Sequence, residues 1–155
     1  MPFVGACGPG DASLPTPTSA GDTESTAATA DSGSPTAARA GLERLEPAAA
    51  HEAMQAGALL VDTRCGDLRR ETGIIPGSVH VGLSVLFWRP DPTSGHDDPA
   101  LSDLTRQVIL LCAHGYSSSL AAGTLRELGF ARATDVVSGF EGWVGAGLPV
   151  ERMAD

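Results

Sequence analysis

The 155-residue sequence contains no lysine, and its ten basic residues, all arginines, stand against 19 acidic residues, for a net charge of -9. Such an acidic chain is a poor match for nucleic acid or for an anionic membrane surface, because like charges repel. The sequence also lacks any run of about 18 apolar residues, the length that a membrane-spanning helix requires. We therefore expect neither nucleic acid nor membrane among its partners.

Cysteine is scarce, since the chain has only Cys7, Cys65 and Cys112. A secreted disulfide scaffold carries more cysteines and an even number of them. Reduced thiols and a cytoplasmic location are therefore expected. The sequence has no CxxC pair and no cluster of histidine and cysteine, so we predict no metal site and no cofactor.

The first forty residues have a composition unlike the rest of the chain. Alanine, threonine, glycine, proline and serine fill 30 of these 40 positions. A segment of this kind buries too little apolar surface to offset its ordering entropy. We predict a disordered low-complexity tail over residues 1–40 and a single domain over residues 41–155, which is long enough to form one core.

From residue 41 onward, apolar runs alternate with helical patterns. Alternation of this kind predicts an α/β domain whose mostly parallel sheet is covered by helices on both faces. A helical turn over 84–89 would place Leu86 and Trp88 on or near the core. The expected strands are 57–63, 74–83, 107–112 and 133–139, and the expected helices are 47–57, 65–72, 117–130 and 140–148.

The stretch VILLCAHGYSSSLAA, residues 108–122, places Cys112 at the end of the strongest strand, before a loop of small residues. Sites of open α/β sheets lie beyond the carboxyl ends of their strands. Gly115 permits a tight loop, and the serines that follow are candidate caps of the next helix. Inward N–H groups and the helix dipole would stabilise a thiolate, lowering the cysteine pKa from about 8.5 to roughly 3.5–7.5. The alternative is that Cys112 is a small core residue at the end of a strand.

Four motifs, in this order along the chain, resemble those of the rhodanese-like domain family. They are LLVDTR (59–64), GIIPGS (73–78), CAHGYSS (112–118) and GFEGWVGAGLP (139–149), and the resemblance covers roughly residues 43–151. It implies a rhodanese-like α/β fold, a five-stranded parallel sheet with helices on both faces.

The resemblance also implies a sulfurtransferase in which Cys112 is the catalytic residue and carries a persulfide. Sulfane sulfur would pass from a small donor, thiosulfate or a persulfide, to a thiol, cyanide-like or protein acceptor. The family often has a basic residue directly after the cysteine and an arginine five positions after it, where this chain has Ala113 and Ser117, so thiosulfate activity is expected to be weak. Arg64 or Arg89 could instead reach the mouth of the site. The predicted substrate-binding residues are Ala113, His114, Gly115, Tyr116, Ser117, Ser118 and Arg64.

Two other functions compete with this hypothesis. A rhodanese-type module could bind a partner or sense oxidants without significant turnover, although retention of Cys112 favours the enzyme. A cysteine phosphatase of a related fold would have an arginine six positions after its cysteine, for bidentate recognition of phosphate. Ser118 occupies that position, so we set the phosphatase aside.

Overall fold

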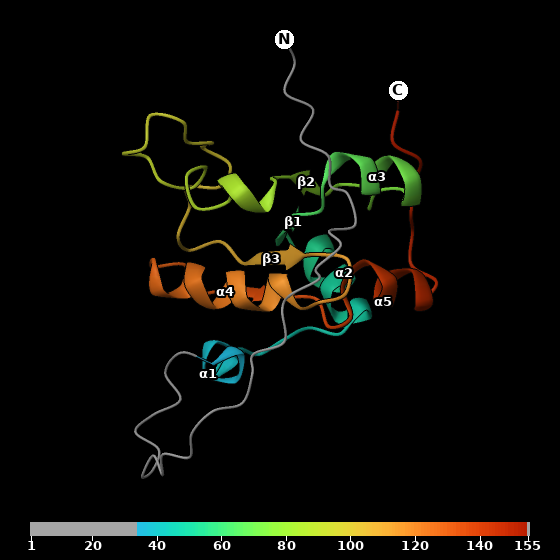
Figure 1. Ribbon diagram of the computed structural model, residues 1–155, viewed down its shortest axis with the longest axis horizontal. Coiled ribbons are helices and arrows are strands. Elements are labelled where there is room, and N and C mark those ends of the chain that lie inside the picture. The colour runs from blue at the N-terminus through green and yellow to red at the C-terminus, as the bar shows by residue number, and fades with distance from the viewer. Residues whose placement is uncertain (1–33, 155) are drawn as a thin grey trace, which may run out of the picture.

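The computed structural model describes residues 34–154 (Figure 1). Within them, four strands form one sheet. The strands are β1 (Leu59–Asp62), β2 (Val79–His80), β3 (Val108–Leu111) and β4 (Ala133–Asp135). All neighbouring pairs are parallel and the spatial order is β2-β1-β3-β4. Every residue of β1 and β3 is buried, which explains why both strands read as unbroken apolar runs.

The sheet differs from the expected one in having four strands in the described part of the chain instead of five. A single parallel bridge joins Leu45 to Val136 at the outer edge of β4, where a fifth strand would lie. The Leu45 amide donates to Asp135 O at 2.9 Å, and the Val137 amide donates to Leu45 O at 2.8 Å. Pro47 then begins a helix, so the pairing ends after this one residue.

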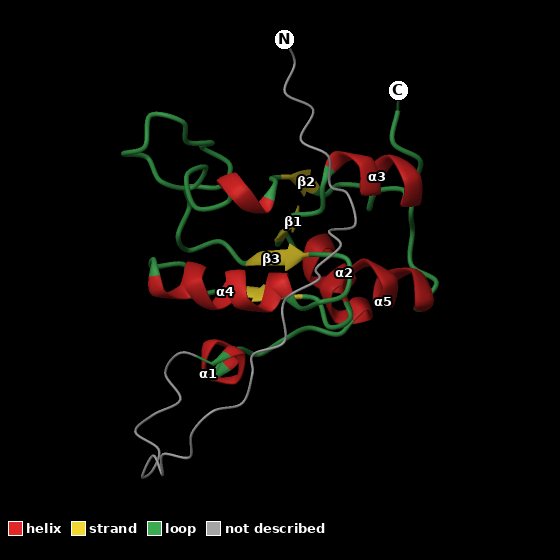
Figure 2. Cartoon of the chain, viewed as in Figure 1, coloured by secondary structure: helices red, strands yellow, loops and turns green. Residues whose placement is uncertain are grey.

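Helices cover both faces of the sheet, as predicted (Figure 2). On one face, α4 packs its Ala121, Ala122 and Leu125 against the odd-numbered residues of β1. On the other face, α2 and α5 contribute Ala50, Phe140 and Trp143 to a second core. The helices are α2 (Pro47–Gln55), α3 (Gly66–Thr72), the 3-10 turn η1 (Leu83–Val85), α4 (Ser117–Glu127) and α5 (Gly139–Gly145).

A short helix, α1 (Pro35–Arg39), lies within the segment that was predicted to be a disordered tail. Ser34 caps this helix by accepting from the Ala37 amide at 3.1 Å. The helix lies against α4, where a Cβ at Gly123 would collide with the carbonyl group of Ala38. These five residues are therefore helical, and the tail prediction for residues 1–33 lies outside the described chain.

The helical turn after β2 buries only one of the two side chains assigned to the core. Leu86 is 2% exposed, whereas Trp88 is 58% exposed and stacks on the ring of His96. Within residues 34–154, no helix has the length and apolar character needed to cross a membrane.

Candidate active site

Three side chains that could carry chemistry lie along one edge of the sheet because they stand at the ends of parallel strands. Asp62 is the last residue of β1, Asp135 is the last residue of β4, and Cys112 follows directly after β3. The carboxyl ends of parallel strands share an edge, which is where α/β proteins place their sites. Cys112 is 6% exposed, and the loop from residue 113 to residue 116 leads from it into α4.

The loop turns its peptide N–H groups toward the sulfur of Cys112. Gly115 has φ of 81°, and its amide donates to Cys112 Sγ at 3.1 Å. The loop carbonyls are held at the start of α5, where the Phe140 amide donates to Cys112 O at 2.8 Å and the Glu141 amide donates to Ala113 O at 3.1 Å. The backbone thus forms an anion-binding concavity around the sulfur.

A buried polar chain supports the sulfur from the side of β4. Cys112 Sγ lies 3.2 Å from Ser118 Oγ, and the Ser118 hydroxyl donates to Asp135 Oδ2 at 2.8 Å. Arg44 binds the Asp135 carboxylate through Nε at 2.8 Å and Nη2 at 3.0 Å, and Nη2 also donates to Gly115 O at 2.6 Å. Ser118 and Asp135 are fully buried.

The environment of Cys112 favours the thiolate. Burial raises the pKa of the Cys112 thiol, but hydrogen bonds from Ser118, from Ser117 and from the His114 backbone outweigh it and lower the pKa from 9.0 to about 7. A thiol with a pKa near the ambient pH is substantially ionised, and the thiolate is the nucleophilic form. Below pH 7 the thiolate fraction falls, by about tenfold per pH unit.

The loop side chains point largely away from this buried chain. His114 and Glu141 form an exposed pair at the rim, with His114 Nδ1 3.1 Å from Glu141 Oε2. Tyr116 is 57% exposed, and the guanidinium of Arg39 lies 4.9 Å from the centre of its ring. Arg39 Nε also donates to Ser119 Oγ at 2.7 Å. Helix α1 therefore brings a cation to the outside of the loop.

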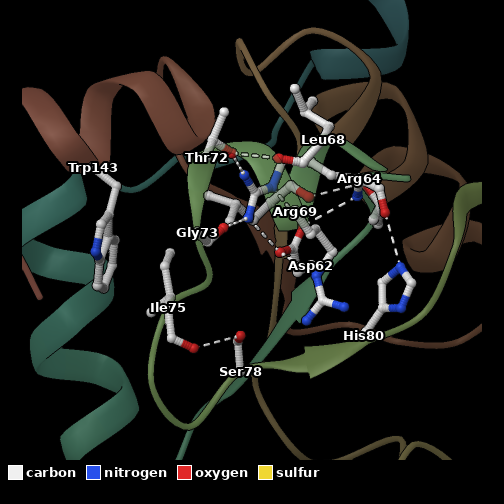
Figure 3. A network of polar contacts seen from close by, with 12 residues as sticks. Asp62, Arg64, Leu68, Arg69, Thr72, Gly73, Ile75, Ser78, His80 and Trp143 are labelled. Carbon is white, nitrogen blue, oxygen red and sulfur yellow. Dashed lines mark hydrogen bonds and ion pairs between the residues drawn. The ribbon is translucent and has the colours of Figure 1, made fainter. Parts of the chain in front are cut away.

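Arg64 is held in a buried ion-pair network (Figure 3). Its Nε and Nη2 donate to the two oxygens of Asp62, at 3.0 and 2.8 Å, and Arg69 Nε donates to Asp62 Oδ2 at 3.1 Å. Further N–H groups of Arg64 donate to Thr72 Oγ1 and Gly73 O. One carboxylate faces two guanidinium groups, so the cluster retains positive charge.

A small cavity of about 100 Å³ joins this network to the loop, with Arg64 on one side and Ala113, His114 and Phe140 on the other. The guanidinium of Arg64 lies 3.7 Å from the centre of the Phe140 ring. Arg89 instead pairs with Asp98 at 3.5 Å in the segment after β2. Of the two arginines considered for the mouth, the structure brings Arg64 to the loop.

Of the other predicted site residues, the structure brings Gly115, Ser117 and Ser118 to the sulfur, whereas the side chains of His114 and Tyr116 lie exposed at the rim. Gly115 and Ser118 contact the sulfur directly, and Ser117 begins α4 beside it. Sequence reasoning missed Arg44 and Asp135, which lie 91 positions apart in sequence and each stand next to a partner of the Leu45–Val136 bridge. Among residues 34–154, no group of three or more histidine, cysteine, aspartate or glutamate side chains could hold a metal ion.

Fold and site together define an α/β protein with a buried cysteine at the carboxyl edge of its sheet, whose sulfur accepts a hydrogen bond from the loop that follows it. Residues 46–146 match the rhodanese-like domain family, and the chain belongs to it. The chain is 31% identical to thiosulfate sulfurtransferase GlpE of Haemophilus influenzae over 109 residues, which cover 70% of this chain and 94% of that relative. It is 36% identical to GlpE of Stutzerimonas stutzeri over 101 residues, which cover 65% of this chain and 84% of that relative. The prediction of a rhodanese-like sulfurtransferase is confirmed at the level of the family.

Solved structures show the same fold. A Rhodopseudomonas palustris protein of unknown function, described as a possible tyrosine phosphatase, matches 81% of this chain and 99% of its own, with a TM-score of 0.70 and 27% identity. The polysulfide-sulfur transferase homodimer of Wolinella succinogenes matches 77% of this chain and 85% of its own, with a TM-score of 0.57 and 25% identity.

Proposed function

We propose that Cys112 carries sulfane sulfur as a covalent persulfide between a small donor and a thiophilic acceptor. The observation that carries this proposal is the position of the Cys112 sulfur, beyond the carboxyl end of β3, where it receives the Gly115 N–H at 3.1 Å and has a pKa of about 7. A nucleophilic thiolate at neutral pH is what the first step requires.

The two half-reactions balance without a further reactant. The Cys112 thiolate attacks the outer sulfur of thiosulfate, an S–S bond to Cys112 forms, the S–S bond of thiosulfate breaks, and sulfite leaves with the bonding pair. An acceptor thiolate or cyanide ion then attacks the terminal sulfur, and the Cys112 thiolate is released. The inward N–H groups of the loop stabilise the terminal negative charge of the persulfide.

The charge around Cys112 bears on which sulfur donor the protein can use. Thiosulfate is a dianion, and the arginines nearest the site, Arg44 and Arg64, are already bound to Asp135 and Asp62. We infer weak use of thiosulfate, with a thiol, cyanide-like or protein acceptor. A cytoplasmic location, inferred from the scarcity of cysteine, stays a prediction.

Intact mass spectrometry after incubation with a sulfane donor tests the proposal. The wild type should gain the mass of one sulfur atom, Cys65→Ser should gain the same, and Cys112→Ser should gain none, because a one-thiol nucleophile carries one adduct. An undiminished adduct on Cys112→Ser would refute the assignment. No adduct on the wild type with thiosulfate, a persulfide or polysulfide would favour a non-catalytic binding module.

An arginine at position 117 should improve the use of thiosulfate. Ser117 is the first residue of α4, beside the sulfur, and a guanidinium there could bind the dianion. We expect Ser117→Arg to raise kcat/KM for thiosulfate about tenfold, equivalent to about 1.4 kcal/mol, and to help a neutral donor much less. Steady-state kinetics with both donors measure this.

The matched control is Ser117→Gln, which adds bulk without charge and should give no gain. If the wild type already uses thiosulfate efficiently and Ser117→Arg changes nothing, the positive charge of the Arg64–Arg69 cluster holds the anion instead.

A further inference from the structure

We propose that Asp135 and Arg44 are positioning residues that direct the single hydroxyl proton of Ser118 either to Asp135 or to the sulfur of Cys112. The inference rests on the proposed role of Cys112 as the nucleophile and adds two side chains to it. Its basis is the buried chain from Arg44 through Asp135 and Ser118 to Cys112, with contacts of 2.8, 2.8 and 3.2 Å.

Ser118 can donate its hydroxyl proton either to Asp135 or to Cys112 Sγ, but not to both at once. A serine hydroxyl has one proton and two lone pairs, whereas carboxylates and thiolates only accept. While Cys112 is a thiol, its S–H donates to Ser118 Oγ and the Ser118 O–H donates to Asp135, so every group has a partner. Once Cys112 is a thiolate or a persulfide anion, it competes with Asp135 for that one O–H.

Arg44 decides how readily the proton turns toward sulfur. Its bidentate bond satisfies both oxygens of Asp135, so the carboxylate remains paired when Ser118 turns away. Without Arg44, Asp135 would be a buried carboxylate that keeps hold of the Ser118 proton. Arg44 Nη2 also holds Gly115 O, so the same guanidinium fixes the peptide whose N–H points at the sulfur.

Other charged groups lie on the elements around the loop, and the variants below leave them intact. Glu46 lies two residues after Arg44, and its negative charge helps to raise the pKa of Arg44. His114 and Glu141 form the exposed rim pair. Asp62 and Arg64 belong to the network at the end of β1.

The pH dependence of Cys112 alkylation by iodoacetamide in a Cys65→Ser, Cys7→Ser background tests the inference. The parent should show half-maximal rate near pH 7. Asp135→Asn frees the Ser118 proton for the thiolate, because the asparagine N–H can donate to Ser118 Oγ, and should lower this midpoint by about one pH unit. Arg44→Gln should raise it by about one unit, and Arg44→Lys should restore most of the change.

Two further variants separate positioning from damage or bare charge. In a Ser118→Ala background, Asp135→Asn should lose at least half of its effect on the midpoint, because the hydroxyl that transmits it is gone. Arg70→Gln removes an arginine from an exposed pair with Asp67 and should leave the midpoint unchanged. Thermal melts identify variants that do not fold. If Asp135→Asn does not fold, the inference is tested by Arg44→Gln and Arg44→Lys, each measured with Ser118 present and in the Ser118→Ala background.

The inference is overturned if Asp135→Asn raises the midpoint or leaves it unchanged, or if Ser118→Ala does not diminish the effects of Asp135→Asn and Arg44→Gln. Alkylation needs no sulfur donor, so this result is independent of the mass test. A protein that alkylates as expected but gains no sulfur would refute the proposed function and leave the positioning role intact.

Discussion

Replacing Asp62 by asparagine should lower the free energy of unfolding by about 3–5 kcal/mol, as measured by urea denaturation. Asp62 is fully buried and accepts side-chain hydrogen bonds from Arg64 and Arg69, whose side chains are 1% and 8% exposed. The substitution leaves two buried guanidinium groups facing a neutral amide. Breaking a buried pair by removing one partner costs far more than the pair contributes, because the remaining charge stays desolvated.

The matched control is Asp67→Asn, which breaks an ion pair of the same chemistry in the exposed first turn of α3. The side chains of Arg70 and Asp67 are 63% and 66% exposed. Loss of an exposed pair should cost about 0–1 kcal/mol. Equal, small losses for the two variants would mean that the Asp62 network is dispensable, and that its arginines reach water when the carboxylate is removed.

Replacing Gly115 by alanine should reduce the alkylation rate of Cys112 and sulfur transfer by about 100-fold, in line with the loss of a preorganised anion donor. The φ of 81° disfavours any side chain, and a Cβ would lie 2.7 Å from Ser138 N and 3.1 Å from Val136 O. The loop must move to relieve these contacts, and its amide then leaves the sulfur. We also expect a loss of about 2–4 kcal/mol in stability.

Gly95→Ala is the control for backbone strain alone. Gly95 has φ of 74° in the segment after β2, but a Cβ there would meet nothing within 4 Å. It should lose about 1–2 kcal/mol and no reactivity. Full reactivity of Gly115→Ala would contradict the role of this peptide in holding the thiolate.

Local patterns in the sequence predicted most of the elements. Each expected strand contains an observed one, and β1 and β3 are wholly buried strands of the kind that produces short apolar runs. The fifth strand came from the family resemblance, and here it is only the Leu45 bridge. Helix α1 was missed because the composition of its surroundings outweighed a local signal, Ser34 as cap before Pro35 at the first helical position.

The site was predictable where its parts are close in sequence. The strand end, the glycine and the serines place Cys112 and its loop, because these residues lie within one stretch of chain. The Arg44–Asp135 pair was not predictable, because its partners are distant in sequence and many arginines could have paired with many carboxylates. The sequence left Arg64 and Arg89 as alternatives for the mouth of the site, and only the structure shows that Arg64 is bound to Asp62, Thr72 and Gly73.

The orientation of the peptide groups in the loop after Cys112 bears on which of its positions can change in sequence. The carbonyls of Cys112 and Ala113 accept hydrogen bonds from α5, and the Gly115 N–H faces the sulfur, so backbone atoms form one part of the surroundings of the sulfur and the Ser117 and Ser118 hydroxyls form another. The side chains of His114 and Tyr116 project outward and take no part in them. We therefore expect substitutions of these two side chains to leave the pKa of Cys112 unchanged, so that the surface around the site can vary independently of the nucleophile that we propose.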